Sequence, residues 1–240
     1  MQVLYEDNHI IIVSKASGEI VQGDKTGDRP LSDTVKQYIK EKYQKPGEVF
    51  LGVVHRLDRP VSGVVVFART SKALSRLNAM FQKGEVHKTY WAIVESGKFF
   101  AGQSAPAERG ADSSLLVHWL TRNEQQNKAY AYDHEVPRSK KAMLRYRPLT
   151  SGDRYTLLEV QLMTGRHHQI RCQLAATGFP IKGDLKYGAK RSNPDGSISL
   201  HARRVEFVHP VSKQTICIEA PVPQDPLWQA LTSPESSARQ

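Results

Sequence analysis

Hydrophobic and polar residues are arranged along the chain in short runs that predict β-strands. Ile10–Ser14 is rich in β-branched residues, and Val64–Ala68 is continuously apolar, as expected of a strand that is buried on both faces. Glycines flank Glu19–Gln22, which we predict to be another short extended segment. The other predicted strands are 87–95, 142–146, 155–162, 200–208 and 215–219.

Apolar residues three and four positions apart predict helices between these strands. Ser32 or Asp33 is predicted to cap a helix that runs to about Tyr43. Thr70 or Ser71 is predicted to cap the next helix, which carries one apolar face and ends at a glycine. Both segments are long enough for three turns, and both should pack an apolar face on a sheet.

Adjacent strands interrupted by a few helices favour an α+β fold with a mixed, largely antiparallel sheet and flanking helices. We expect one domain over residues 1–222. Between residues 98 and 140 the composition shifts to Ser, Gln, Asn, Lys and Gly around an apolar stretch at 115–120. This shift predicts an excursion with its own hairpin, suited to a lid or a binding loop. Residues 223–240 should form a C-terminal tail whose end is disordered.

The charge of the chain narrows its possible partners. Lys and Arg number 34 and Asp and Glu 24 in 240 residues, which gives a formal net charge of +10. This excess favours RNA, DNA or an acidic membrane surface, although a charge spread for solubility would look the same. No apolar run approaches the roughly 18 residues of a membrane helix, and the N-terminal residues lack a signal-peptide pattern. We therefore expect a soluble, cytoplasmic protein that does not contact a membrane.

The sequence lacks the motifs of several common kinds of functional site. Two cysteines, Cys172 and Cys217, are too few for a disulfide framework or a Cys-rich zinc module. His168 and Cys172 are four residues apart, but no second ligand pair accompanies them, so we expect no metal site. Glycine-rich nucleotide-binding motifs and the Gly-x-Ser-x-Gly motif of hydrolases are missing from the sequence. We expect no nucleotide or other cofactor.

A loop over residues 55–63 places one carboxylate, Asp58, between Arg56 and Arg59, just before the predicted buried strand. Nearby guanidinium groups favour the ionised carboxylate and lower its pKa by about 1–3 units, which suits a nucleophile better than a general acid. A surface ion pair worth about 0–1 kcal/mol would explain the same residues equally well. The loop by itself does not decide between these two interpretations.

Two further segments carry candidate chemistry. Residues 164–171, Thr-Gly-Arg-His-His-Gln-Ile-Arg, open a predicted short helix with basic residues where a helix N-terminus can bind an anion. Residues 88–92, Lys-Thr-Tyr-Trp-Ala, place aromatic rings beside a lysine on a strand. Such rings pack in a core or, if they are exposed, stack on a nucleobase. Asp184 lies in a Lys-Gly-Asp turn, and a role as a turn former is its simpler interpretation.

Together these segments resemble the RluA-type family of RNA pseudouridine synthases. The likeness extends over about residues 4–221, and the motifs occur in the family's order and spacing. Val61 stands where the family usually has Thr, and His167 where Thr is common, and we expect neither to abolish activity. The matching motifs are His-Arg-Leu-Asp-x-x-Thr/Ser-Ser-Gly at 55–63, Lys-x-Tyr-x-Ala at 88–92, Thr-Gly-Arg-x-His-Gln-Ile/Leu-Arg at 164–171, and Gly-x-Pro-Ile-x-Gly-Asp-x-x-Tyr-Gly at 178–188.

The resemblance implies the pseudouridine synthase fold, with a central RNA-binding cleft, and the isomerisation of uridine in RNA without a cofactor or metal. By analogy Asp58 is the nucleophile and attacks either the ribose or the base. Tyr90 stacks on the target uracil and helps the C5 proton to leave, while Arg171 pairs with Asp58 and keeps it ionised. The implied substrate-binding residues are His55, Arg56, Lys88, Arg166 and His168, among which Arg56 displaces the target base or fills its vacated place.

The implied partner is ribosomal RNA, with 23S RNA as the first choice, or transfer RNA, bound by a monomer. Family members often carry an N-terminal S4-like domain, whereas here the likeness begins within the first few residues. Target choice is therefore expected to rest on the catalytic domain, including 98–140. The alternative is an RNA-binding module on the same fold that does not turn over, but the presence of Asp58, Tyr90 and Arg171 argues against it.

Overall fold

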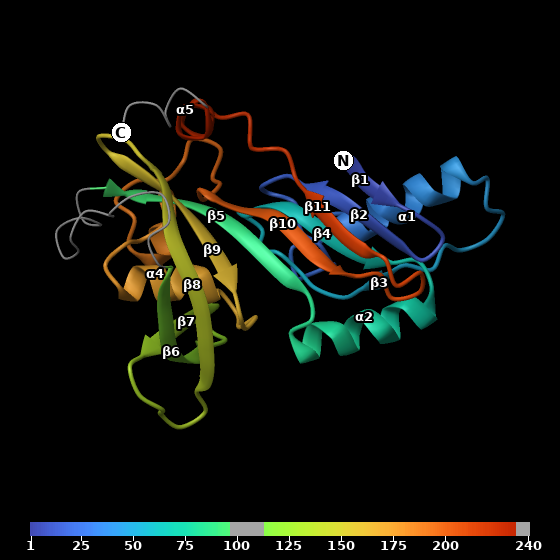
Figure 1. Ribbon diagram of the computed structural model, residues 1–240. Helices are drawn as coiled ribbons and strands as arrows, with labels where there is room; N and C mark the ends of the chain where they lie inside the picture. The colour runs from blue at the N-terminus through green and yellow to red at the C-terminus, as the bar shows by residue number, and fades with distance from the viewer. Residues whose placement is uncertain (97–112, 234–240) are drawn as a thin grey trace. The chain divides into compact units, whose positions relative to one another are not determined.

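The computed structural model describes residues 1–96 and 113–233 (Figure 1). The chain forms two compact units. The first contains residues 1–88 and 202–221, and the second contains the described residues of 89–201 and 222–240. The α+β class with a largely antiparallel sheet and flanking helices is confirmed. None of the helices in the described residues is long and apolar enough to span a membrane.

The first unit is a sheet with two helices, α1 (Leu31–Lys42) and α2 (Ser71–Lys83). Every residue from Ile10 to Val13 and from Val64 to Ala68 is buried, and successive strand residues point to opposite faces, so both faces of the sheet are covered. Helix α2 lies along one face (Figure 1), and its Ala73 and Leu77 belong to the core cluster there. The strand order is β1 (Gln2–Glu6), β2 (Ile10–Lys15), β4 (Ser62–Ala68), β10 (Leu200–Val208) and β11 (Thr215–Glu219), with β3 (Gly52–Val53) paired to β4.

The start of α1 corrects two sequence predictions. Residues 19–22 form no strand, and neither Ser32 nor Asp33 caps the helix. Instead the carbonyl oxygens of Ile20 and Val21 accept hydrogen bonds from the first helical N–H groups, those of Leu31 (2.7 Å) and Ser32 (3.1 Å). The extended segment therefore satisfies the donors of a helix rather than those of a neighbouring strand. In α2 the predicted cap is confirmed, because the Thr70 side chain accepts from the Ala73 N–H.

The second unit is a sheet covered on one face by α4 (Gln169–Ala176). Its strand order is β5 (His87–Glu95), β9 (Tyr155–Leu162), β8 (Lys140–Ser151), β6 (Ser114–Asn123) and β7 (Lys128–Tyr132). β6 and β7 are the hairpin predicted within 98–140, drawn green beside the yellow β8 in Figure 1. The part of that excursion between 97 and 112 lies outside the described residues. A 3-10 turn, η1 (Leu185–Tyr187), follows α4.

The predicted C-terminal tail contains a helix, α5 (Pro226–Thr232). The Asp225 side chain accepts from two N–H groups of its first turn, and Trp228 packs with Ile93 and Leu157 of the second unit. An aspartate followed by proline at the first helical position is a start signal that sequence analysis could have used. The predicted disorder at the end of the tail falls on residues 234–240, outside the described chain.

Candidate active site

The Asp58 loop is built around a buried lysine of the neighbouring strand. Lys15 ends β2 and is only 1% exposed. Its Nζ donates hydrogen bonds to the carbonyl oxygens of Asp58 (3.3 Å), Arg59 (3.1 Å) and Val61 (2.6 Å). Burial lowers the pKa of Lys15 to about 8. One buried ammonium group thus holds the backbone of this loop, and the Asp58 side chain is partly exposed.

The loop leads into β4 through a glycine that no other residue could replace without a shift of the backbone. Gly63 has a φ of 118°, and a Cβ at this position would lie 2.3 Å from the carbonyl oxygen of Ala202. Two strands can approach this closely only where a side chain is missing. Gly63, the glycine of the first motif, therefore fixes where the Asp58 loop joins β4.

The two arginines that flank Asp58 in the sequence point to different surroundings. Arg59 donates to Asp28 (Nη1–Oδ2 2.6 Å) and to Thr26 (Nη2–Oγ1 2.8 Å). Arg56 is exposed. The contacts of Arg59 therefore hold the turn over residues 24–28 against the loop.

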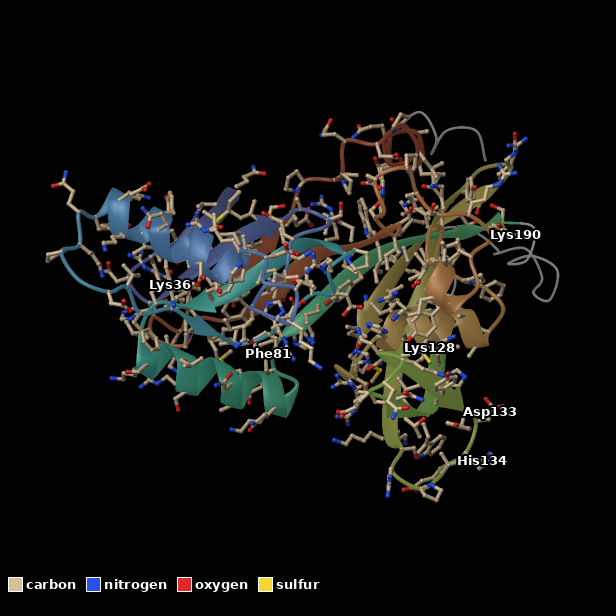
Figure 2. All side chains as sticks on the ribbon, turned by 180° about the vertical axis from the view of Figure 1, so that it is seen from behind. Lys36, Phe81, Lys128, Asp133, His134 and Lys190 are labelled. Atoms are coloured by element: carbon tan, nitrogen blue, oxygen red, sulfur yellow. The ribbon has the colours of Figure 1, made fainter. Side chains whose placement is uncertain are left out.

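His55 anchors the beginning of the loop. Its Nε2 accepts the Val66 N–H of β4 (3.0 Å), and its ring stacks on Phe81 of α2, with ring centres 5.0 Å apart. Figure 2 shows Phe81 on the side of α2 that faces the sheet. The Nζ of Lys88 lies 5.5 Å from the same Phe81 ring. Burial and the Lys88 charge lower the pKa of His55 to about 3, and burial also lowers that of Lys88.

These contacts give His55 a structural role in addition to its predicted role in substrate binding. The Val66 N–H occupies Nε2, so a direct RNA contact of His55 would have to use the other ring nitrogen. A strand N–H bonded to an imidazole is a long-range contact, and no local pattern in the sequence indicates it.

The neutral His55 should make the protein sensitive to acid. The folded chain keeps this ring neutral down to about pH 3, whereas an unfolded His binds a proton near pH 6.5. Between these values the unfolded chain binds more protons, so this group lowers stability by up to about 1.4 kcal/mol for each unit that the pH falls. In His55→Gln, the Oε1 of the new side chain can accept the Val66 N–H. The free energy of unfolding of this variant, measured in urea, should therefore fall less steeply than that of the wild type between pH 7 and pH 4. The exposed His134→Gln is the control, and an unchanged slope in His55→Gln would contradict the assignment.

Arg171 of α4 is held by an aspartate that sequence analysis had given a different role. Its Nε and Nη2 donate to the two carboxylate oxygens of Asp184, at 2.7 and 2.9 Å. Arg171 is 5% and Asp184 1% exposed, so the pair is buried and bidentate. Gly183 allows this geometry, since it has a φ of 89° and a Cβ there would lie 2.8 Å from Asn193. Asp184 is thus more than a turn former.

His168 and Tyr187 stand next to this ion pair. His168 Nδ1 lies 2.9 Å from the Tyr187 hydroxyl, which accepts the Ala129 N–H of β7 at 2.8 Å. The Arg171 guanidinium lies 5.1 Å from the Tyr187 ring centre. Burial raises the pKa of Tyr187. The contact of His168, a predicted substrate-binding residue, with Tyr187 is therefore part of the packing around Arg171.

The first residues of the 164–171 motif join α4 to β8. Gln169 Oε1 accepts from the Thr164 hydroxyl (2.8 Å) and the Arg166 N–H (2.9 Å), while Gln169 Nε2 donates to the Met143 carbonyl (3.0 Å). Arg166 is exposed, and its Nε donates to the Lys141 carbonyl (3.1 Å). Most of this motif therefore fixes the position of Arg171 through the backbone of α4.

The predicted site residues divide between the two units. His55, Arg56, Asp58 and Lys88 belong to the first unit, and the structure brings His55 and Lys88 together around Phe81. The second unit contains the buried Tyr90 of β5, together with Arg166, His168 and Arg171. In the first unit a buried lysine holds the backbone of Asp58, and in the second unit a buried carboxylate holds the guanidinium of Arg171. No group of three or more His, Cys, Asp or Glu side chains suited to a metal ion occurs in the described residues.

Comparison with known proteins agrees with the motifs. Residues 9–176 match the family model described as RNA pseudouridylate synthase. An uncharacterized RNA pseudouridine synthase of Bacillus subtilis, YhcT, is 33% identical over 94% of this chain and 70% of its own. A tRNA pseudouridine synthase C of Vibrio cholerae is 29% identical, with 97% of this chain and 95% of the relative covered.

Two further comparisons concern a ribosomal enzyme and a solved structure. A ribosomal large subunit pseudouridine synthase D of Xanthomonas campestris is 32% identical over 94% of this chain and 67% of its own. The human RNA Pseudouridylate Synthase Domain Containing 4 has a similar fold, with a TM-score of 0.73 and 21% identity over 95% of this chain and 91% of that one. The family identified from the motifs is thereby confirmed: this chain belongs to the RNA pseudouridylate synthases, in their RluA type.

Proposed function

We propose that this protein converts specific uridines of ribosomal or transfer RNA to pseudouridine with Asp58 as the nucleophile. The observation that carries the proposal is the buried Lys15, which fixes the loop through hydrogen bonds to the main-chain carbonyls of Asp58 and Val61. The names of relatives from Xanthomonas and Vibrio support the two RNA classes. We place the reaction in the cytoplasm and assign it to a monomer that needs no metal or cofactor.

The reaction breaks the bond between N1 of uracil and C1′ of the ribose, turns the base, and forms a bond from C5 to C1′. C5 loses its proton and N1 gains one, so the product is an isomer of the substrate. Asp58 attacks either C1′ or the base, and both routes require an ionised carboxylate. A uridine inside a helix hides both C1′ and C5, so the enzyme must flip it out of the stack at a cost of a few kcal/mol. Stacking and phosphate contacts with the protein offset this cost.

Arg171 is proposed to orient Asp58 and to keep it ionised. Its Nε and Nη2 are bound by Asp184, which fixes the orientation of the guanidinium group. A guanidinium fixed at one edge loses little further entropy when it pairs at another. Tyr90 is proposed to stack on the flipped uracil and to assist the loss of the C5 proton.

The remaining contacts are proposed to position the RNA. Arg56 and Arg166 are exposed cations, suited to phosphates or, for Arg56, to the vacated place in the base stack. Lys88 is a further phosphate contact. The excess charge of +10 adds a salt-sensitive attraction that does not depend on the RNA sequence.

Release of tritium from RNA that carries 5-tritiated uridine tests the reaction. The purified protein should release tritium from total RNA of cells that lack the gene, in the presence of a chelator, and the modified positions should match the pseudouridines missing from that RNA. RNA binding without release would instead favour the non-catalytic RNA-binding module. Release that stops in chelator would overturn the metal-free assignment.

A further inference from the structure

Among the described residues, one face of the β6–β7–β8 sheet carries exposed aromatic and basic side chains. On the opposite face Leu120, Ala129 and Ala142 pack with Cys172 of α4. Because strand residues alternate between faces, the neighbours of these three residues point away from α4. They include the aromatic face, which we define as Trp119, Tyr130, Tyr132, Lys141 and Arg145.

The strand register places the members of the aromatic face side by side. Tyr132 of β7 is paired with Trp119 of β6, which is paired on its other side with Lys141 of β8. Tyr130 follows on the same face of β7 and lies opposite Thr121. Directly opposed residues have Cβ atoms roughly 5 Å apart, so the rings of Trp119 and Tyr132 are neighbours.

Exposure and charge distinguish this face from ordinary sheet packing. Tyr130 and Tyr132 are 37% and 38% exposed. The Nζ of Lys141 lies 5.9 Å from the Trp119 ring centre, and that of Lys128 5.5 Å from the Tyr130 ring centre. Figure 2 shows Lys128 on this hairpin. Exposed rings between cations on adjacent strands are the arrangement on which nucleobases stack while phosphates pair with the cations.

The aromatic face is continuous with the motif that holds Arg171. Arg166 donates to the carbonyl of Lys141, and Thr164 accepts the N–H of Met143, which stands between Lys141 and Arg145 on the same face. An RNA strand bound at Arg166 could therefore continue onto the aromatic face without leaving the second unit. The neighbouring acidic residue Glu159 is paired with Arg147, which reduces its repulsion of phosphates.

We propose that the aromatic face binds unpaired nucleotides of the substrate RNA next to the target site and contributes to the choice of RNA. The link to catalysis rests on the proposed function, but stacking can be measured without turnover. An oligoadenylate of about eight nucleotides contains no uridine and should quench the fluorescence of Trp119. The quench should saturate in the wild type and be lost in Trp119→Phe.

Tyrosine variants test the stacking directly. Tyr130→Ala combined with Tyr132→Ala should weaken oligoadenylate binding about 100-fold, at roughly tenfold for each ring, while the matching Phe variants should bind within about twofold of wild type. Lys141→Gln should reduce the slope of log affinity against log salt by about 0.7. Tyr43→Ala removes a similarly exposed ring from the first unit and is the control. Equal affinity of the double Ala variant and the wild type, or equal loss in Tyr43→Ala, would overturn the proposal.

Three further outcomes separate this proposal from its alternatives. In the wild type, a substrate RNA with unpaired flanks should have a lower KM than the minimal stem-loop. In the double Ala variant the two RNAs should have the same KM. A protein that turns over no RNA but still shows ring-dependent quenching would overturn the proposed reaction and not the stacking surface. Sedimentation that shows a wild-type dimer and a monomeric double Ala variant, with unchanged oligoadenylate affinity, would identify the face as a contact between copies and overturn the RNA assignment.

Discussion

Asp58→Asn should abolish pseudouridine formation, by about 10⁴-fold or more, and leave RNA affinity within a few-fold of wild type. Asparagine has the shape of aspartate but not its charge, so it cannot form the covalent intermediate. The loop should keep its conformation, because the hydrogen bonds from Lys15 and from the Val61 N–H reach the main-chain carbonyl of Asp58. The loss should therefore be chemical and not structural.

Tritium release and filter binding on the same RNA measure the two quantities. Asp28→Asn is the matched control, since it changes an exposed carboxylate of the same unit that is bound by Arg59. Asp58→Ala guards against slow deamidation of the Asn variant. Residual turnover above about one per cent in Asp58→Ala would rule out Asp58 as the nucleophile, whereas a parallel loss of RNA affinity would indicate a binding role instead.

The local sequence pattern was sufficient to predict most of the strands. The predictions for 87–95, 155–162, 200–208 and 215–219 agree with β5, β9, β10 and β11 at both ends. These segments have strong alternation or β-branched content and are bounded by polar turns, so the neighbouring residues carry the information. The motifs likewise identified the family, because each one keeps its residues within a short stretch of sequence.

The errors and omissions concern groups whose partners are remote in the sequence. Lys15 ends a strand that begins with four apolar residues, and its importance follows only from carbonyls more than forty residues away. Ile20 and Val21 are residue types that favour strands, yet their carbonyls accept the first N–H groups of α1. Tertiary contacts therefore outweighed strand propensity at these two residues. Asp184 looks like a turn residue until α4 brings Arg171 to it. Spacing along the chain does not encode such contacts.

The Arg171–Asp184 pair should have a structural role and a catalytic role that can be separated. Asp184→Ala leaves a buried guanidinium without its carboxylate and should lower the free energy of unfolding by about 3–5 kcal/mol. Arg171→Met combined with Asp184→Leu removes both charges and fills the space with apolar groups, so it should recover most of that stability. Turnover should stay low in the double variant, because no guanidinium remains to orient Asp58.

Urea unfolding gives the stability of each variant, and tritium release together with RNA binding gives its activity. Arg171→Lys completes the series: it keeps a charge beside Asp184 but cannot reproduce the two-pronged contact, so it should bind RNA almost normally and turn over slowly. Recovery of both stability and turnover in the double variant would show that Arg171 serves only the fold. A stable Asp184→Ala protein would show that the guanidinium does not depend on Asp184. Low turnover in a stable double variant leaves the orientation of Asp58 as the function of Arg171, which is the reason for a charged pair at a position where apolar residues would serve the fold equally well.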